Sequence, residues 1–237
     1  MKKIVRNSYL FTIKNKIMKT ILSILLLAFF IPAFSQTRLN GYANYVFDDR
    51  VDSYYDANNY YDSKIKGGFQ WGVGLEYLVG PSNGIEILYL HQKTTAPTTY
   101  IQTGQLGGVK NTEFDVNLDW IMLGGNRYIK SPGSKVEGFG GLMAGAALLD
   151  FKNPDNGNSN SATKFAWGLR GGANLWATPK ISIKLQAQLV SAVQGAGGTL
   201  YFGTGGAGVG VTSYSSMLQF GLGGGISLAL GGTSAKR

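Results

Sequence analysis

Few residues of this chain could carry out chemistry, and their scarcity removes several classes of site. The chain has no Cys and a single His, His91. A disulfide framework, a Cys-based zinc site and a Cys nucleophile are therefore excluded, as is a metal site or triad that needs two His. A lipid-active enzyme would need a nucleophile beside His91, but Gln92 and Lys93 follow it. We expect no catalytic, metal or cofactor site, and interpret His91 as an interfacial residue.

Four charged residues are placed symmetrically about two short turns. Glu76 and Glu86 lie at equal distances from residue 81, and Arg170 and Lys184 lie at equal distances from residue 177. If each turn joins two antiparallel strands, the members of each pair face each other. A buried charge is costly unless it is paired. The spacing therefore predicts that two acids meet two bases inside the fold, either as a structural plug or as a salt-bridge gate.

A further group of carboxylates alternates along one segment. Asp115 and Asp119 share a strand face with Glu113. Two such carboxylates can act as a general acid and base, and they can also bind a cation. Because no His stands with them, we expect them to line a polar, water-filled part of the interior.

Two connecting segments have suggestive compositions. Residues 48–62 contain several Asp and Tyr, whose oxygens could hold Ca²⁺, but the EF-hand spacing and its Gly are absent. Tyr clusters also suit recognition, and a solvated loop is the simplest interpretation. Residues 203–208 fit G-x-G-x-x-G without following a strand or opening a helix, so we expect a flexible external loop rather than a dinucleotide site.

The composition favours an all-β protein. The chain of 237 residues contains 35 Gly and 12% aromatic residues, but only 15% charged residues. The net charge of +9 arises mainly from six bases within residues 1–36, where there is no acid, which leaves 16 bases and 13 acids in the rest. The basic balance is therefore no indication of nucleic-acid binding.

The beginning of the chain has the features of an export signal. Residues 21–34 are apolar and follow several bases, and the run is too short to cross a membrane as a helix. Residues 33–35 fit the small-x-small cleavage pattern. We predict a signal peptide over residues 1–35, with Met18 as a candidate for the true start, and one domain over residues 36–237.

The body of the chain is divided into eight segments with a period of two. Alternation is clear in residues 69–77, 114–122, 165–175, 181–189 and 218–230, and weaker in 38–48, 84–93 and 136–149. Long and short connections alternate along the chain: the long ones are 49–65, 94–112, 150–163 and 194–213, and the short ones are 80–83, 131–134 and 178–180. This order predicts an eight-stranded antiparallel up-and-down transmembrane β-barrel. A secreted β-sandwich is the alternative.

In the barrel, one face of each segment meets lipid and the other meets the lumen. The apolar sets of all five clear segments, including the one from Phe114 to Met122, are assigned to the lipid side. The lumen is then predicted to hold a charge network of Glu76, Glu86, Arg170, Lys184, Asp115 and Asp119. Two aromatic girdles are expected, an outer one of Trp71, Trp120, Trp167, Phe114 and Phe165 and an inner one of Tyr77, Tyr128 and Trp176.

This pattern resembles the OmpA- and OmpX-like family of small outer-membrane β-barrels over nearly all of residues 38–230. The resemblance rests on strand count, loop alternation and aromatic placement. It implies a polar plug in the lumen, and contacts with outer-membrane lipid and the barrel-assembly machinery. Unlike many members, the last segment ends at Leu230 rather than at an aromatic residue. We expect a non-enzymatic protein in the bacterial outer membrane whose four external loops contact surfaces, an extracellular ligand or other envelope proteins; a narrow or gated channel and a lipid-modifying barrel enzyme are the alternatives.

Overall fold

The computed structural model describes residues 36–51, 55–56, 59–101, 109–193, 199–203, 206–210 and 217–231. The predicted signal peptide, its cleavage site and Met18 lie outside the described residues. So do parts of the connection at 194–213, including two residues of the G-x-G-x-x-G segment. Within the described part, no helix is long and apolar enough to cross a membrane.

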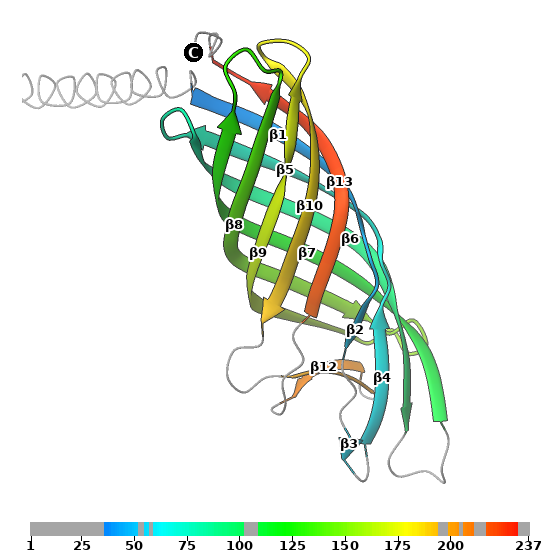
Figure 1. The fold of residues 1–237 in the computed structure, drawn as a ribbon. Helices are drawn as coiled ribbons and strands as arrows, with labels where there is room; N and C mark the ends of the chain where they lie inside the picture. The colour runs from blue at the N-terminus through cyan, green and yellow to red at the C-terminus, as the bar shows by residue number, and fades with distance from the viewer. Residues whose placement is uncertain are drawn as a thin grey trace, which may run out of the picture.

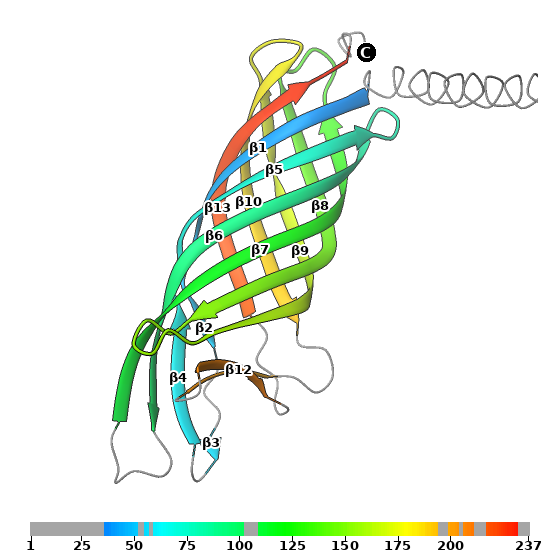
Figure 2. The same cartoon turned by 180° about the vertical axis from the view of Figure 1, so that it is seen from behind.

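Eight antiparallel strands form a closed barrel (Figures 1 and 2). They are β1 (Thr37–Val46), β5 (Gly68–Leu78), β6 (Asn83–Ile101), β7 (Val109–Lys130), β8 (Val136–Lys152), β9 (Ser159–Trp176), β10 (Ile181–Val193) and β13 (Met217–Ala229). Each strand pairs with the next along the chain, and β1 pairs with β13 to close the ring. The predicted fold is confirmed.

The short connections all lie at one end of the barrel, as predicted. They join β5 to β6, β7 to β8, and β9 to β10. Gly80 and Gly133 stand in two of them with φ of 76° and 74°. This left-handed backbone conformation is open to Gly without steric cost, which explains why Gly occupies both turns.

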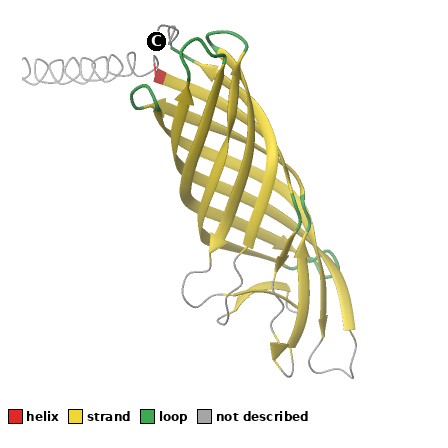
Figure 3. Ribbon diagram, viewed as in Figure 1, coloured by secondary structure: helices red, strands yellow, loops and turns green. Residues whose placement is uncertain are grey.

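The long connections contain more strand than expected (Figure 3). Three short strands, β2 (Asp49–Val51), β3 (Tyr55–Asp56) and β4 (Asn59–Ile65), occupy most of the segment 49–65. The strand β4 pairs with the outer part of β6, from Ser63 opposite Thr98 to Tyr61 opposite Tyr100. A separate hairpin of β11 (Thr199–Gly203) and β12 (Gly206–Gly210) lies within the segment 194–213, and the parts of 94–112 and 150–163 nearest the barrel continue its strands.

The wall of the barrel is much taller on one side. The strand β7 has 22 residues and β6 has 19, whereas β1 has 10 and β5 has 11. A tilted strand needs only about 9–11 residues to cross a bilayer. The strands β6 and β7 therefore continue well beyond the membrane, as the long arms in Figure 2 show.

The lipid faces predicted for the clear segments are confirmed for β5, β9, β10 and β13, and β1 alternates in the same way. Their apolar outward side chains are exposed, with Phe69 63%, Ile183 51% and Ile226 60% accessible, and the alternate positions are buried. An exposed apolar band around a closed barrel requires lipid rather than water as its neighbour.

The faces of β7 are the reverse of the prediction. Phe114, Val116, Leu118, Trp120 and Met122 are buried in the interior, and Glu113, Asp115, Asn117 and Asp119 point outward. The reason is the height of β7. Its outer half stands above the bilayer, where outward positions meet water and apolar side chains are buried inside; farther down the same strand, Ile121 and Leu123 are exposed to lipid.

Candidate functional site

An ion pair crosses the inner half of the lumen. The guanidinium of Arg170 on β9 contacts the carboxylate of Glu86 on β6, and neither side chain is exposed to solvent. Arg170 also donates to Asn126 Oδ1 at 3.0 Å and to Tyr42 OH at 3.1 Å. Glu86 accepts further hydrogen bonds from Tyr42 OH at 2.6 Å and from Asn40 Nδ2 at 2.8 Å. These bonds satisfy both charges away from water, as burial demands.

The second carboxylate of this layer is Glu76, which lies opposite Glu86 in the register of β5 and β6, as the turn symmetry predicted. Glu76 accepts hydrogen bonds from Asn126 Nδ2 at 2.7 Å and from Tyr128 OH. Gly74 and Gly84 leave the space that these two carboxylates fill, since a Cβ at either position would overlap a carboxylate oxygen. The Gly-rich lumen face is therefore a requirement of the charge network.

The predicted pairing of Arg170 with Lys184 is wrong. Arg170 faces Gln188, and Lys184 faces Asn174. The turn is centred near residue 179 rather than 177, because Trp176 still pairs with Ser182 and Thr178 Oγ1 then accepts from the backbone N–H of Ile181 at 3.0 Å.

Lys184 is nevertheless buried in the lumen, with 1% exposure. Its Nζ lies 4.6 Å from the ring centroid of Phe139 and 5.4 Å from that of Tyr42, and it forms no hydrogen bond within the described residues. Both rings can interact with the ammonium through their faces.

A further ion pair closes the short-turn end, and sequence analysis missed it. Arg38 Nη1 lies 3.1 Å from Glu137 Oε2, and both side chains are buried. The guanidinium stacks between the rings of Tyr128 and Trp176, at 4.8 and 4.9 Å from their centroids. Arg38 precedes the alternating part of β1, and Glu137 lies in a Gly-rich strand whose faces the sequence left open. The described lumen thus holds three acids and three bases: Glu76, Glu86, Glu137, Arg38, Arg170 and Lys184.

Amide side chains form a separate group in the lumen. Gln188 Nε2 donates to Gln70 Oε1 at 2.6 Å, and Gln186 Nε2 donates to Asn44 Oδ1 at 3.1 Å. These bonds link β1, β5 and β10 across the barrel. They are uncharged, so they fill the interior without any net charge.

A packed apolar cluster fills much of the outer half of the interior, beside the buried amides of Gln70, Gln92 and Gln219, where a wet, polar lumen was expected. Trp120, Phe114, Leu118, Leu149 and Met217 are fully buried there and belong to one packed cluster. Asp115 and Asp119 are therefore not members of the lumen network, because they lie on the opposite face of β7. A hydrated ion entering from outside would meet packed apolar side chains before it reached the charges.

The aromatic girdles are only partly as predicted. Trp71, Phe165 and Trp167 are exposed to lipid at the outer end, and Tyr77 at the inner end. Trp120, Phe114, Tyr128 and Trp176 point inward instead. Tyr128 and Trp176 are drawn inside because they donate to the buried carboxylates of Glu76 and Glu137, which need donors.

His91 lies on the outer wall with partners that the sequence did not reveal. Its Nδ1 is 2.7 Å from Asp119 Oδ1, and the same oxygen accepts from Tyr89 OH at 2.6 Å. The ring of Trp71 packs against Tyr89 and His91, with centroid distances of 5.7 and 5.6 Å. The reversed face of β7 brings Asp119 beside His91, so an assignment of Asp119 to the lumen concealed the pair.

Two carboxylates above the membrane, those of Glu113 and Asp48, are engaged by lysines. Lys66 Nζ lies 2.8 Å from Glu113 Oε1, and Lys64 pairs with Asp48. The hydrogen bond from Lys66 lowers the pKa of Glu113, and the one from Lys64 lowers the pKa of Asp48. Within the described ranges, no group of three His, Asp or Glu side chains could hold a metal ion; part of the segment 48–62 lies outside them.

The architecture has counterparts among solved structures. The crystal structure of Neisserial surface protein A matches 82% of this chain and 97% of its own, with a TM-score of 0.51 and 12% identity. The outer membrane protein OprG from Pseudomonas aeruginosa matches 81% of this chain and 95% of its own, with a TM-score of 0.51 and 13% identity. The chain has the fold of a small outer-membrane β-barrel. No protein-family model and no curated protein matches it.

Proposed function

We propose that this protein is a non-enzymatic component of the bacterial outer membrane, whose closed barrel anchors an external β-platform that contacts surfaces, ligands or other envelope proteins. The platform consists of β2, β4 and the parts of β6 and β7 beyond His91 and Asp119. The observation that carries this proposal is the filling of the barrel. Ionic side chains occupy the inner half of the lumen, and buried amides together with a packed apolar cluster fill the outer half.

An outer-membrane location is supported by the apolar band and by the shared fold. Outward side chains such as Phe69, Leu123 and Ile226 are at least 60% exposed, which suits lipid. Insertion there would require export, to which the apolar segment at residues 21–34 is suited, and the barrel-assembly machinery.

The platform has its own stabilising contacts, which support a role in binding. Ser63 Oγ and Thr98 Oγ1 lie 2.8 Å apart between β4 and β6, and Thr95 Oγ1 donates to Glu113 Oε1 at 2.7 Å between β6 and β7. A preordered surface loses less entropy on binding than a free loop does. The connections 49–65 and 94–112 therefore extend from a base that is held together by side-chain hydrogen bonds.

The test combines folding and conductance. The mature protein, folded into detergent, is expected to migrate differently on a gel before and after heating, and to give no conductance above the lipid background in planar bilayers. Stable single-channel steps in the unmodified protein would overturn the closed-anchor proposal. Solubility in plain buffer without a heat-dependent shift would overturn the membrane barrel itself.

A narrow or gated channel is the second candidate, and one observation favours it. Buried polar atoms of the lumen, among them Lys184 Nζ, Asn174 Oδ1 and Ser182 Oγ, have no hydrogen-bond partner among the described residues. Such atoms are usually satisfied by water. In this candidate, the Arg170–Glu86 pair would act as the gate, and the same recordings would show rare openings that increase when the pair is removed.

The pair of His91 and Asp119 favours a third candidate, a lipid-modifying enzyme. A carboxylate can orient a His as a general base. Within the described residues, however, the contacts of His91 are with Asp119 and Trp71, and no hydroxyl nucleophile is among them. Loss of a lipid modification in a His91→Ala variant would favour the enzyme over the anchor.

A further inference from the structure

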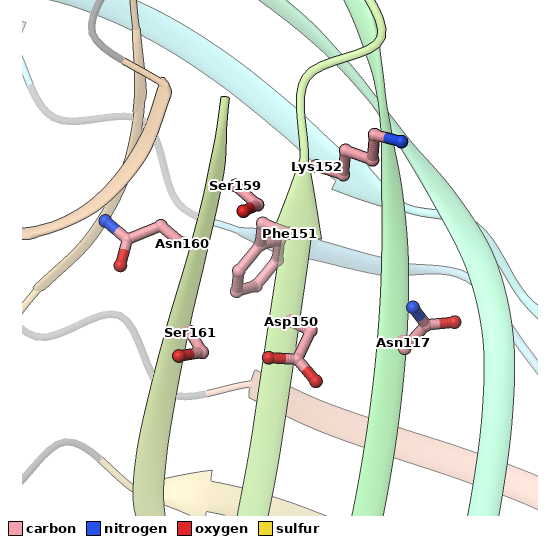
Figure 4. Close-up of a pocket in the computed structure, with 7 residues that line it drawn as sticks. All are labelled: Asn117, Asp150, Phe151, Lys152, Ser159, Asn160 and Ser161. Carbon is pink, nitrogen blue, oxygen red and sulfur yellow. The ribbon is translucent and has the colours of Figure 1, made fainter. Parts of the chain in front are cut away.

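A polar depression lies on the outer wall of β7, β8 and β9 (Figure 4). Its volume is about 330 Å³. The residues that line it are Asn117, Asp150, Phe151, Lys152, Ser159, Asn160 and Ser161. Asn117, Asp150 and Ser161 lie directly opposite one another on the three strands, and Lys152 and Ser159 form the next opposed pair. Directly opposed residues of antiparallel strands point to the same face, so these five side chains share the outward face.

Within the described ranges, none of these five side chains forms a hydrogen bond or an ion pair with another residue. By contrast, the neighbouring carboxylates Glu113 and Asp119 are engaged by Lys66, Thr95, Tyr89 and His91. The depression thus combines free donors and acceptors on three paired strands.

The depression stands directly above the apolar band. Two residues before Asp150 is Leu148, which is 36% exposed on the same face, and four residues after Ser161 is Phe165, which is 58% exposed. At about 3.4 Å per residue along a tilted strand, these separations correspond to roughly 5–10 Å above the apolar band. The polar zone of each leaflet is about that thick. A ligand in the depression is therefore at the height of lipid headgroups in the outer leaflet.

The chemistry of the depression selects among headgroups. Hydroxyl groups of a sugar both donate and accept hydrogen bonds, so they match a carboxylate, an amide, an ammonium and two hydroxyls together. A phosphate group only accepts, and the carboxylate of Asp150 would repel it. We infer that this depression binds the saccharide headgroup of a glycolipid in the outer leaflet. This inference rests on the proposed outer-membrane location.

The test uses the full mature barrel in phosphatidylcholine nanodiscs with and without digalactosyl diacylglycerol, a glycolipid whose saccharide headgroup carries no phosphate. We expect the barrel to retain this glycolipid through detergent exchange and gel filtration. The combined variant Asp150→Ala and Ser161→Ala is expected to bind it about tenfold more weakly, since each loses a hydrogen bond of ordinary strength. Asp62→Ala is the matched control, because Asp62 is an exposed carboxylate on β4, away from the depression.

The outcomes separate this inference from the proposed function. A barrel that inserts and shows no conductance, but retains digalactosyl diacylglycerol no better than phosphatidylglycerol, overturns the glycolipid site and leaves the anchor standing. Equal retention by the unmodified protein, the double variant and the Asp62→Ala control also overturns the site. A protein that fails to insert into nanodiscs contradicts the membrane anchor, and the inference falls with it.

Discussion

Arg170 and Glu86 form a buried ion pair although 84 residues separate them in the sequence. They belong to β9 and β6, which are not neighbours in the barrel wall, so their contact spans the lumen. The pair links two opposite parts of the wall in a way that backbone hydrogen bonds cannot. Asn126, Tyr42 and Asn40 then complete the hydrogen bonding around it.

Removal of one partner should destabilise the barrel strongly. Arg170→Ala leaves Glu86 as an uncompensated buried charge, which typically costs about 3–5 kcal/mol. The measurement is the denaturant midpoint of unfolding in detergent micelles, followed by the loss of the heat-dependent gel shift. Arg50→Ala serves as a control, since Arg50 is an exposed arginine beyond the barrel, and should change the midpoint little. Equal midpoints for both variants would contradict the importance of the pair.

Glycines on the lumen face should be much less replaceable than glycines on the lipid face. A Cβ at Gly74 would overlap the carboxylate of Glu86, which four other groups hold in place, whereas a Cβ at Gly41 meets no atom within 4 Å. We expect Gly74→Ala to lower the unfolding midpoint and Gly41→Ala to leave it unchanged or raise it slightly, because Ala restricts the unfolded chain. A lower unfolding midpoint for Gly41→Ala than for Gly74→Ala would contradict the position of the Glu86 carboxylate beside Gly74.

The four tryptophans offer a direct test of which way β7 faces. Trp71 is 44% exposed on the lipid side, whereas Trp120 has no exposed surface. In variants that keep a single Trp and replace the other three by Phe, brominated lipid should quench the fluorescence of Trp71 and leave that of Trp120 nearly unaffected. Strong quenching of both residues would mean that Trp120 faces lipid in the outer girdle together with Trp71, as the sequence pattern predicted.

The contrast between β5 and β7 explains how far the sequence could predict this fold. Along β5 the strand ends where the membrane ends, so alternation from Phe69 to Tyr77 identifies the lipid face correctly. Along β7, the alternation from Phe114 to Met122 is equally regular. Where a strand extends above the membrane, however, the apolar face is the one buried inside and the polar face is exposed to water. A period of two gives the two faces of a strand and not which of them is inside.

The contacts of the candidate site also divide into those that a local sequence pattern reveals and those that it does not. The pairing of Glu76 with Glu86 was predictable because a four-residue turn fixed the register. The contact of Arg170 with Glu86 depends on barrel diameter and strand shift, and the contact of Arg38 with Glu137 depends on faces that the Gly-rich β8 does not reveal. Contacts across a lumen join strands that are not neighbours, so no local pattern records them.

Closure of the barrel between its first and last strands can be tested by cross-linking, because the chain has no Cys of its own. Leu39 on β1 lies opposite Leu228 on β13, and both point toward lipid. A Leu39→Cys and Leu228→Cys variant should form a disulfide on mild oxidation, since directly opposed residues have suitable Cα separations. Leu39→Cys with Leu222→Cys, which is six residues out of register, should remain reduced. A β-sandwich in which these strands are unpaired would leave both variants reduced.

The external platform should become less stable as the pH falls, because the ion pair between Lys66 and Glu113 is lost when Glu113 is protonated. The hydrogen bond from Lys66 holds the pKa of Glu113 below its ordinary value, with a second contribution from Thr95. A carboxyl whose pKa is depressed in the folded state contributes stability above its unfolded pKa of about 4.3, and that contribution is lost as the pH falls through the lower, folded value. Asp48, held by Lys64, shifts in the same direction. We therefore expect amide exchange in β4 and the outer part of β6 to accelerate below about pH 4 before the barrel itself unfolds.

The Glu113 carboxyl can be followed by NMR titration in the same experiment. Lys66→Ala should return its pKa toward the ordinary value, because the largest cause of the shift is removed. Lys93→Ala is the control, since Lys93 is an exposed lysine on β6 that forms no ion pair with Glu113 within the described residues. High salt should reduce the shift, because both partners are half-exposed and their attraction is screened. A Glu113 pKa that stays low in the Lys66→Ala variant would mean that Thr95, and not Lys66, dominates the stabilisation of the carboxylate.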